Sequence, residues 1–165
     1  MAITTVNNRT LKREADQWRL TTAFTGDASP IATNLEQVDT DGFGGIGSAM
    51  TESSGIFTFP STGIYLIQCV FQQTLNDDTR YHHSGIETTT DNSSYDTAQS
   101  NTSFIQQTSS NTTYSMNSGS FIFDVTSTST HKCRFVVSGG NASTSTSGDS
   151  TYNSTYFTFI RLGDT

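Results

Sequence analysis

The chain has 165 residues, of which 32% are hydrophobic and only 14% are charged, and its formal net charge is −7 at pH 7. This length suits one domain with a buried core, and the acidic balance makes nucleic acid a poor partner for the body of that domain. The low charge argues against disorder, because disordered chains usually combine low hydrophobicity with high net charge. Abundant Ser, Thr, Asn and Gln, with 11 Phe and 6 Tyr to fill a core, favour an all-β fold.

An N-terminal arm is predicted over residues 1–15, followed by one folded domain over residues 16–165. Half of the eight Lys and Arg residues lie in the first nineteen positions: Arg9, Lys12, Arg13 and Arg19. Only two acidic residues offset them there, so the arm is mildly basic while the body is acidic. We therefore expect Arg9, Lys12 and Arg13 to dock on an acidic surface. A frayed, solvated tail is the alternative.

No segment is typical of a secretory leader or a membrane span. The N-terminus lacks an apolar stretch, and no apolar run approaches the length needed to cross a bilayer. We therefore expect a protein that is made in the cytoplasm and has no membrane partner.

Short strands are predicted before the centre of the chain at residues 17–24, 35–38 and 46–50. In the first of them, Trp18 and Leu20 alternate with Arg19 and Thr21, which is the pattern of a half-buried strand. The second is expected at the edge of a sheet.

The most apolar stretch lies between residues 56 and 71. A short run ends at Pro60, which has no N–H to continue a hydrogen-bond ladder, and Gly63 lets the backbone turn sharply. The run over residues 64–71 is almost continuously apolar, which indicates a central strand buried on both faces. Such a strand needs a layer on each side, and we expect the second layer to be another subunit.

The second half of the chain alternates polar loops with apolar segments. Residues 80–90 predict a polar strand of the outer sheet. Residues 91–120 are nearly all Ser, Thr, Asn, Gln and Tyr, and an unstructured loop of that length is unusual. We therefore expect a hairpin anchored by residues 104–105 and 114–116. Further strands are predicted at residues 120–125, 131–137 and 152–162. Together these strands predict a two-sheet sandwich with jelly-roll connections.

A family resemblance lies in the sequence G-I-F-T-F-P-S-T-G-I-Y of residues 55–65. It resembles the core signature of C1q/TNF-like jelly rolls, and residues 154–162 resemble the last strand of that family. The segment D-Q-W-R-L-T-T at residues 16–22 and the terminal R-L-G-D-T are similar to virion proteins of marine bacteriophages. The resemblance implies a homotrimer in which the second face of the central sheet packs around a threefold axis.

Large apolar residues are more numerous than one core of this size obviously needs. Seven are predicted to lie in the trimer interface or the core: Tyr65, Ile67, Phe71, Phe135, Tyr156, Phe157 and Phe159. The alternative is that they are ordinary core or isolated surface residues.

Catalytic motifs are absent from the sequence, which contains no G-x-S-x-G elbow, P-loop, C-x-x-C or Rossmann glycine fingerprint. His82 and His83 are adjacent on a predicted strand, so their side chains point to opposite faces and do not share a metal. Asp39 and Asp41, followed by a glycine, resemble the opening of a calcium loop, but no acid completes it. We expect a plain turn there, no enzyme activity and no cofactor, with calcium as the alternative; a surface metal site at the two histidines with Asp77 and Asp78 nearby is a further alternative.

Cys69 and Cys133 lie in predicted apolar strands. A reducing cytosol would keep them as buried thiols. The resemblance places their strands side by side, so a disulfide is the alternative.

These observations lead to the hypothesis of a structural virion protein of a phage. In this interpretation a homotrimer decorates or cements the capsid through its arm, on the major capsid protein or another virion component. The alternative is a receptor- or glycan-binding module of a phage fibre, in which loops 91–103 and 141–150, with Tyr95 and Tyr152, bind a host-surface glycan. A free bacterial or secreted binding protein ranks lower.

Overall fold

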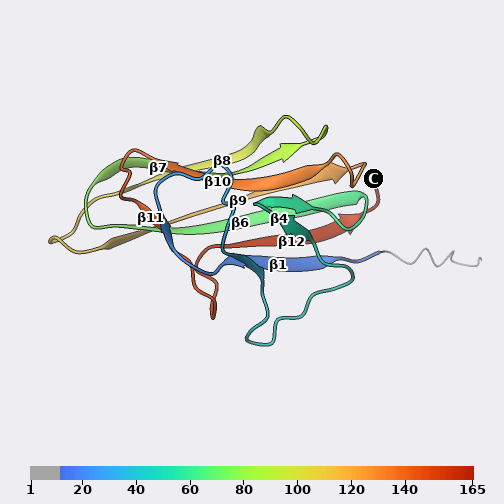
Figure 1. Ribbon diagram of the computed structural model, residues 1–165, viewed down its shortest axis with the longest axis horizontal. Coiled ribbons are helices and arrows are strands. Elements are labelled where there is room, and N and C mark those ends of the chain that lie inside the picture. Colours follow the sequence, from blue (N-terminus) through green and yellow to red (C-terminus); the bar gives the residue numbers. More distant parts are fainter. Residues whose placement is uncertain (1–11) are drawn as a thin grey trace, which may run out of the picture.

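Two antiparallel β-sheets pack face to face in the computed structural model, which describes residues 12–165 (Figure 1). The larger sheet runs in the order β2-β11-β6-β12-β1-β3. Strands β11 and β12 pair with successive parts of β6, and β9 pairs with β6 along its whole length. Its strands are β1 (Ala15–Leu20), β2 (Phe24–Thr25), β3 (Leu35–Gln37), β6 (Gly63–Leu75), β9 (Thr113–Val125), β11 (Ser145–Thr146) and β12 (Tyr156–Gly163). Within residues 12–165, no helix is long and apolar enough to span a membrane.

The second sheet has five strands in the order β4-β5-β10-β7-β8. They are β4 (Thr51–Ser53), β5 (Ile56–Thr58), β7 (Thr79–Thr89), β8 (Asp96–Ile105) and β10 (Lys132–Gly139). Chain neighbours such as β5 and β6 lie in different sheets, so the fold has the crossing connections of a jelly roll. The all-β sandwich predicted from the sequence is confirmed.

The corner between β5 and β6 is where the chain passes from one sheet to the other. Pro60 follows β5, and β6 begins at Gly63. A Cβ atom on Gly63 would lie 2.4 Å from Nε of Arg161 and 2.6 Å from the carbonyl oxygen of Gly163, which is closer than real contacts allow. Glycine is therefore required where the start of β6 meets the end of β12.

The core between the sheets is aromatic at its centre. Phe57 of β5 contacts the ring of Phe135, with centroids 5.4 Å apart, and Phe135 stacks on Phe157 of β12. Six of the seven predicted interface or core residues lie in this core: Tyr65, Ile67, Phe71, Phe135, Phe157 and Phe159. Their side chains fill the space between the two sheets of one chain.

Two predicted elements are wrong. Residues 91–120 do not form a hairpin, because β8 pairs with β7 in one sheet and β9 pairs with β6 in the other. Strand β9 pairs along the whole of the thirteen-residue β6 and has the same length. Because β8 and β9 belong to different sheets, the chain crosses between the sheets at residues 106–112. The strand expected at residues 46–50 is a single bridge between Ile46 and Ala15, and β4 begins only at Thr51.

Both cysteines are buried free thiols. The expectation that their strands are neighbours is wrong, because β6 belongs to the larger sheet while β10 lies between β5 and β7 in the other. Burial raises the pKa of Cys69 to about 12, and burial also raises the pKa of Cys133.

Candidate functional site

The outward side of the larger sheet carries a row of apolar side chains. Along β6, alternate residues from Tyr65 onward face the core and are buried, while Ile64, Leu66 and Val70 point away and are only half-buried. A strand of a monomer that faced water would have polar residues at those outward positions. Three of the six outward residues of β6 are therefore apolar, as on a covered surface, while Gln68, Gln72 and Thr74 are polar.

The register of the sheet extends this row to both neighbouring strands. Leu66 pairs with Ile122 of β9 and with Ile160 of β12, and Val70 pairs with Tyr156. Paired residues of an antiparallel sheet share a face. We call this surface the outer face; its apolar residues are Ile64, Leu66, Val70, Tyr114, Met116, Ile122, Tyr156 and Ile160.

The β9 part of the outer face is the most exposed. Tyr114, Met116 and Ile122 are 65%, 61% and 60% exposed, respectively. The sequence did not predict these three residues as interface residues, because Ser, Asn and Gly separate them. They are identified as outer-face residues because each of them pairs with an outward residue of β6.

A polar band crosses the middle of the outer face. Gln68 pairs with Ser120 of β9 and with Thr158 of β12, and Gln17 donates from Nε2 to Oγ1 of Thr158 at 2.8 Å. Small residues on β9 leave a hollow of about 340 Å³ here, bordered by Gln68 and Tyr156. Of the seven predicted interface or core residues, Tyr156 is the one on this face.

Glu14, near the C-terminal end of the predicted arm, is hydrogen-bonded to residues of the core. Glu14 is buried and accepts hydrogen bonds from the hydroxyls of Tyr65 and Ser61, the latter at 2.7 Å. Burial alone would raise the pKa of Glu14, but these hydrogen bonds and the nearby Lys12 lower it overall. Burial, followed by the hydrogen bond to Glu14, raises the pKa of Tyr65 to about 12.

Two of the three predicted docking residues can be placed. The ammonium of Lys12 lies 2.9 Å from the Glu14 carboxylate, and Arg13 is exposed. Arg9 lies outside the described residues. Among residues 12–165 the first buried side chain is that of Glu14, one residue before β1, and the carbonyl of Lys12 accepts a hydrogen bond from Nη1 of Arg161 at 2.8 Å.

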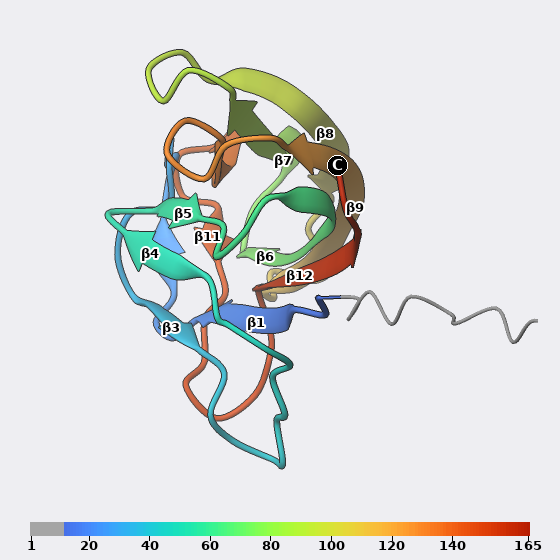
Figure 2. The ribbon, with the colours of Figure 1, turned by 90° about the vertical axis from the view of Figure 1, so that its right-hand side faces the viewer.

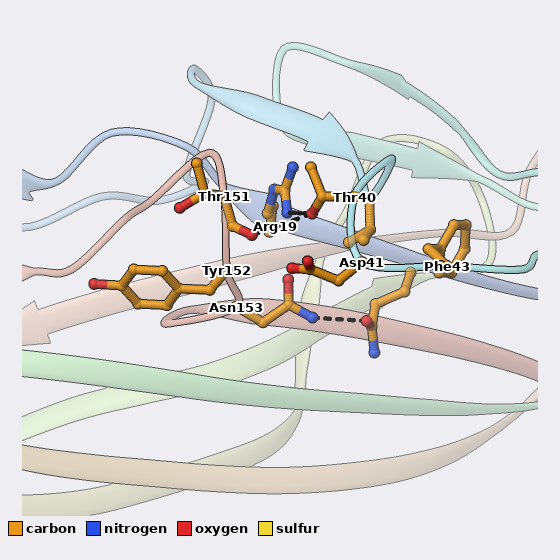
Figure 3. A pocket seen from close by; sticks show the side chains of 10 residues that line it. Arg19, Thr40, Asp41, Phe43, Thr151, Tyr152 and Asn153 are labelled. Carbon is orange, nitrogen blue, oxygen red and sulfur yellow. Dashed lines mark hydrogen bonds between the residues drawn. The ribbon is translucent and has the colours of Figure 1, made fainter.

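A second candidate site, which we call the edge pocket, lies where β1 and β3 form the edge of the larger sheet (Figure 3). Arg19 at its base is 1% exposed and donates to the carboxylates of Glu36 and Asp39 at 2.7 and 2.8 Å. The sequence pattern had placed Arg19 on the polar side of its strand. It is buried because these two carboxylates neutralise its charge.

The predicted turn at residues 40–43 forms one wall of the edge pocket. Asp41 and Gly42 have φ values of 55° and 76°, and the N–H of Phe43 donates to the carbonyl of Thr40 at 3.1 Å. Positive φ at both central positions is typical of a type I′ turn. Asp39, one of the two candidate calcium ligands, pairs with Arg19. No group of three or more His, Cys, Asp or Glu side chains within residues 12–165 is placed to hold a metal ion.

The two adjacent histidines point in opposite directions, as predicted. His82 is fully buried and lies 3.2 Å from the amide of Asn117, whereas His83 is half-buried and bonds to Thr102. Burial, and to a lesser extent the neighbouring His83, lowers the pKa of His82. The pair therefore does not form one site.

The two loops proposed for glycan recognition lie at opposite ends of the sandwich. Asn141 donates to Asp77, just before β7 begins, whereas the turn at residues 91–95 follows the other end of β7. Eleven extended residues span roughly 35 Å. The turn at residues 91–95 and the loop at residues 141–150 therefore do not form one recognition surface, and residues 96–103 belong to strand β8.

Comparison with known proteins bears on the fold. A scan against protein-family models and a search of curated proteins found no match. Among solved structures, murine APRIL at pH 8.5 aligns with a TM-score of 0.59 and 15% identity, covering 92% of this chain and 100% of that chain. The fold is a TNF-like jelly roll.

A second similar structure is Eiger TNF from S. frugiperda. It aligns with a TM-score of 0.61 and 11% identity, over 93% of this chain and 95% of that chain. The expected C1q/TNF-like jelly roll is therefore confirmed for the fold. At these identities the likeness concerns the fold alone.

Proposed function

We propose that this TNF-like jelly roll is a non-enzymatic structural protein of a phage particle, built as a homotrimer around its outer face. The apolar outer face is the observation that carries the proposal. Its apolar side chains form two groups on either side of the polar band, and exposed apolar patches rimmed by polar residues mark association surfaces. Burying one large apolar side chain contributes about 1.5–3 kcal/mol, so covering the outer face favours association.

Two further copies of the chain are the proposed occupants of the outer face. The resemblance of residues 55–65 to C1q/TNF-like jelly rolls supports a threefold arrangement. In a closed ring each copy presents the same surfaces, and such a ring stops growing at a fixed size. The polar band around Gln68 gives the face a pattern that favours one packing register, because a buried polar side chain needs a partner.

The place in the virion is supported by charge and by sequence resemblance. The basic arm precedes an acidic body, so the arm suits docking on an acidic component such as a major capsid protein. Residues 16–22 and the C-terminal segment resemble virion proteins of marine bacteriophages. We propose that the trimer decorates or cements the particle and that its arm makes the attachment.

Incorporation into particles tests this function. Removing residues 1–11 and changing Lys12 and Arg13 to Gln removes all three docking cations and keeps Glu14 with its hydrogen bonds from Tyr65 and Ser61, so the shortened chain should fold and assemble normally. Quantitative mass spectrometry of purified particles should find the full-length chain in multiples of three and should find the shortened chain depleted. Equal incorporation of both chains would rule out attachment by the arm, and absence of the full-length chain from particles would rule out the structural role.

A further inference from the structure

The edge pocket adjoins the outer face on the same side of the larger sheet, because Arg19 pairs with Tyr156, and Gln17, which lines the pocket, donates to Thr158 of the polar band. It has a volume of about 280 Å³ and is lined by residues of β1, of the turn after β3 and of the loop before β12. None of its lining residues belongs to the apolar part of the outer face. Figure 2 shows the connections before β4 and before β12 extending together beyond β1 and β3.

The walls of the edge pocket are fixed by hydrogen bonds between segments. The hydroxyl of Thr40 accepts a hydrogen bond from Nη1 of Arg19 at 2.8 Å and donates to the carbonyl of Thr151 at 3.1 Å. The carboxylate of Asp149 accepts hydrogen bonds from the hydroxyl and the N–H of Thr151, which lower the pKa of Asp149. The N–H of Asp149 donates to the carbonyl of Leu20. A ligand would therefore bind without first ordering the walls.

The pocket offers hydrogen-bond acceptors that lack protein donors. The amide nitrogen of Asn153 donates to Gln17 at 2.7 Å, but its Oδ1 atom is buried without a partner among residues 12–165. In the same part of the chain no hydrogen bond or ion pair engages the carboxylate of Asp41. Figure 3 shows Asp41 and Asn153 between Tyr152 and Phe43. Asp41 is exposed, whereas Oδ1 of Asn153 is buried. A buried acceptor is normally satisfied, so a bound molecule should supply a hydroxyl or N–H donor to Asn153 here.

Aromatic rings flank these acceptors. Tyr152 is 61% exposed, and Phe43 lines the pocket from the opposite segment. A ring that stands free at the mouth of a polar pocket can pack against the C–H face of a ligand. The combination of a few fixed polar groups and aromatic surface is typical of small-molecule sites.

The charge around the pocket selects against anions and gives little support to a metal ion. Arg19 is outnumbered by the acids Glu36, Asp39 and Asp41, so an anionic ligand would be repelled. Calcium takes six to eight oxygen ligands, whereas the carboxylate of Asp39 is already committed to Arg19. A neutral polyol with donor hydroxyls and an apolar face satisfies the acceptors and the rings together.

We propose that the edge pocket binds one neutral pyranose unit of a glycan. Its hydroxyls donate to Asp41 and Asn153, and its C–H face packs on Tyr152. This site takes the place of the separated loops 91–103 and 141–150 as the glycan-binding surface. The inference does not depend on trimer formation or on a virion role, so the two proposals can fail independently.

Titration of the full-length chain with simple glycosides tests the proposal. Methyl glycosides of mannose, galactose and N-acetylglucosamine would be added up to about 50 mM, since a single sugar typically binds near the millimolar range. Backbone amide shifts measured by NMR should change at residues 40–43 and 151–153 with at least one of them. Failure of all three to shift these amides would overturn the proposal.

Matched variants distinguish binding from loss of folding. Tyr152→Ala should weaken binding about fivefold, while Tyr152→Phe should leave it nearly unchanged, because only the ring is used. Asp41→Gly keeps the positive φ and removes the carboxylate, so it should also weaken binding. Equal binding of N-acetylneuraminic acid, or amide shifts with calcium chloride but with no sugar, would contradict the neutral-sugar assignment.

Discussion

The outward sides of the two sheets differ in whether their side chains find partners within the same chain. On the five-stranded sheet, Arg134 of β10 donates to Glu87 of β7 at 2.6 Å and its guanidinium lies over the ring of Tyr95 at 4.2 Å. On the larger sheet, the outer face leaves Tyr114, Met116 and Ile122 more than half exposed, with no such charged pairing among them. The five-stranded sheet also exposes the large apolar side chain of Phe104 in β8, whereas the larger sheet exposes a row of such side chains, which we propose is covered by further copies.

The largest expected effect comes from placing a charge on the outer face. Leu66→Glu should dissociate the trimer and lower the solution mass about threefold, because a buried unpaired carboxylate is strongly unfavourable. Light scattering after size-exclusion chromatography measures this mass. Val136→Glu is the matched control, since Val136 is a half-buried outward residue of β10 in the other sheet. If both variants stayed trimeric, or both dissociated, the contrast between the sheets would be wrong.

Loss of the hydrogen bonds to Glu14, near the end of the predicted arm, should give the next largest effect. Glu14→Gln weakens charged hydrogen bonds from Tyr65 and Ser61 and should lower the free energy of unfolding by about 1–3 kcal/mol at pH 7. The pKa of Glu14 is lowered from 4.5 on folding, so its contribution is present above that value and is lost as the pH falls through the lower, folded-state pKa.

Urea unfolding at neutral pH and at about pH 3 measures this dependence on pH. The difference between wild type and Glu14→Gln should shrink in acid. The exposed carboxylate of Asp96 offers a control, because Asp96→Asn should change little at either pH. A difference for Glu14→Gln that is the same at both pH values would contradict the assigned role of the carboxylate.

A smaller effect is expected on the five-stranded sheet. Arg134→Met removes the ion pair with Glu87 and the contact with Tyr95, which should cost about 0.5–1.5 kcal/mol of unfolding free energy. The solution mass should not change, because this side of the molecule needs no partner. A loss of trimer in Arg134→Met would show that both sheets take part in assembly.

The smallest effect concerns the cysteines. Since Cys69 and Cys133 are free thiols on different sheets, dithiothreitol should leave the Tm of thermal unfolding unchanged. A clear fall in Tm under reducing conditions would reveal a disulfide that stabilises the native state.

The centre of the fold could be predicted because one local pattern determines it. Pro60, Gly63 and the apolar run after them indicate a corner and a central strand without reference to the rest of the chain. The alternation along that run also separates the core side from the outward side. By contrast, β9 is long only because β6 is long, and Asn117 and Gly119 at its inward positions carry no apolar signal. Pairing with a distant strand thus sets its length.

The edge pocket could not be predicted for a related reason. Arg19, Asp41 and Asn153 are far apart in sequence and meet only after β1, the turn and the loop before β12 are in place. The pattern around Arg19 indicated an exposed residue, because two later carboxylates that bury it cannot be recognised locally. The sequence did identify Tyr152 as a recognition residue, although within a different loop surface.

The central claim is that the outer face is covered by two further copies of the chain. Sedimentation equilibrium of the full-length protein at low micromolar concentration tests it most directly, because the mass of one chain is 17.9 kDa. We expect a single species of three chains that persists on dilution. A monomer with the same native circular dichroism spectrum would contradict the claim.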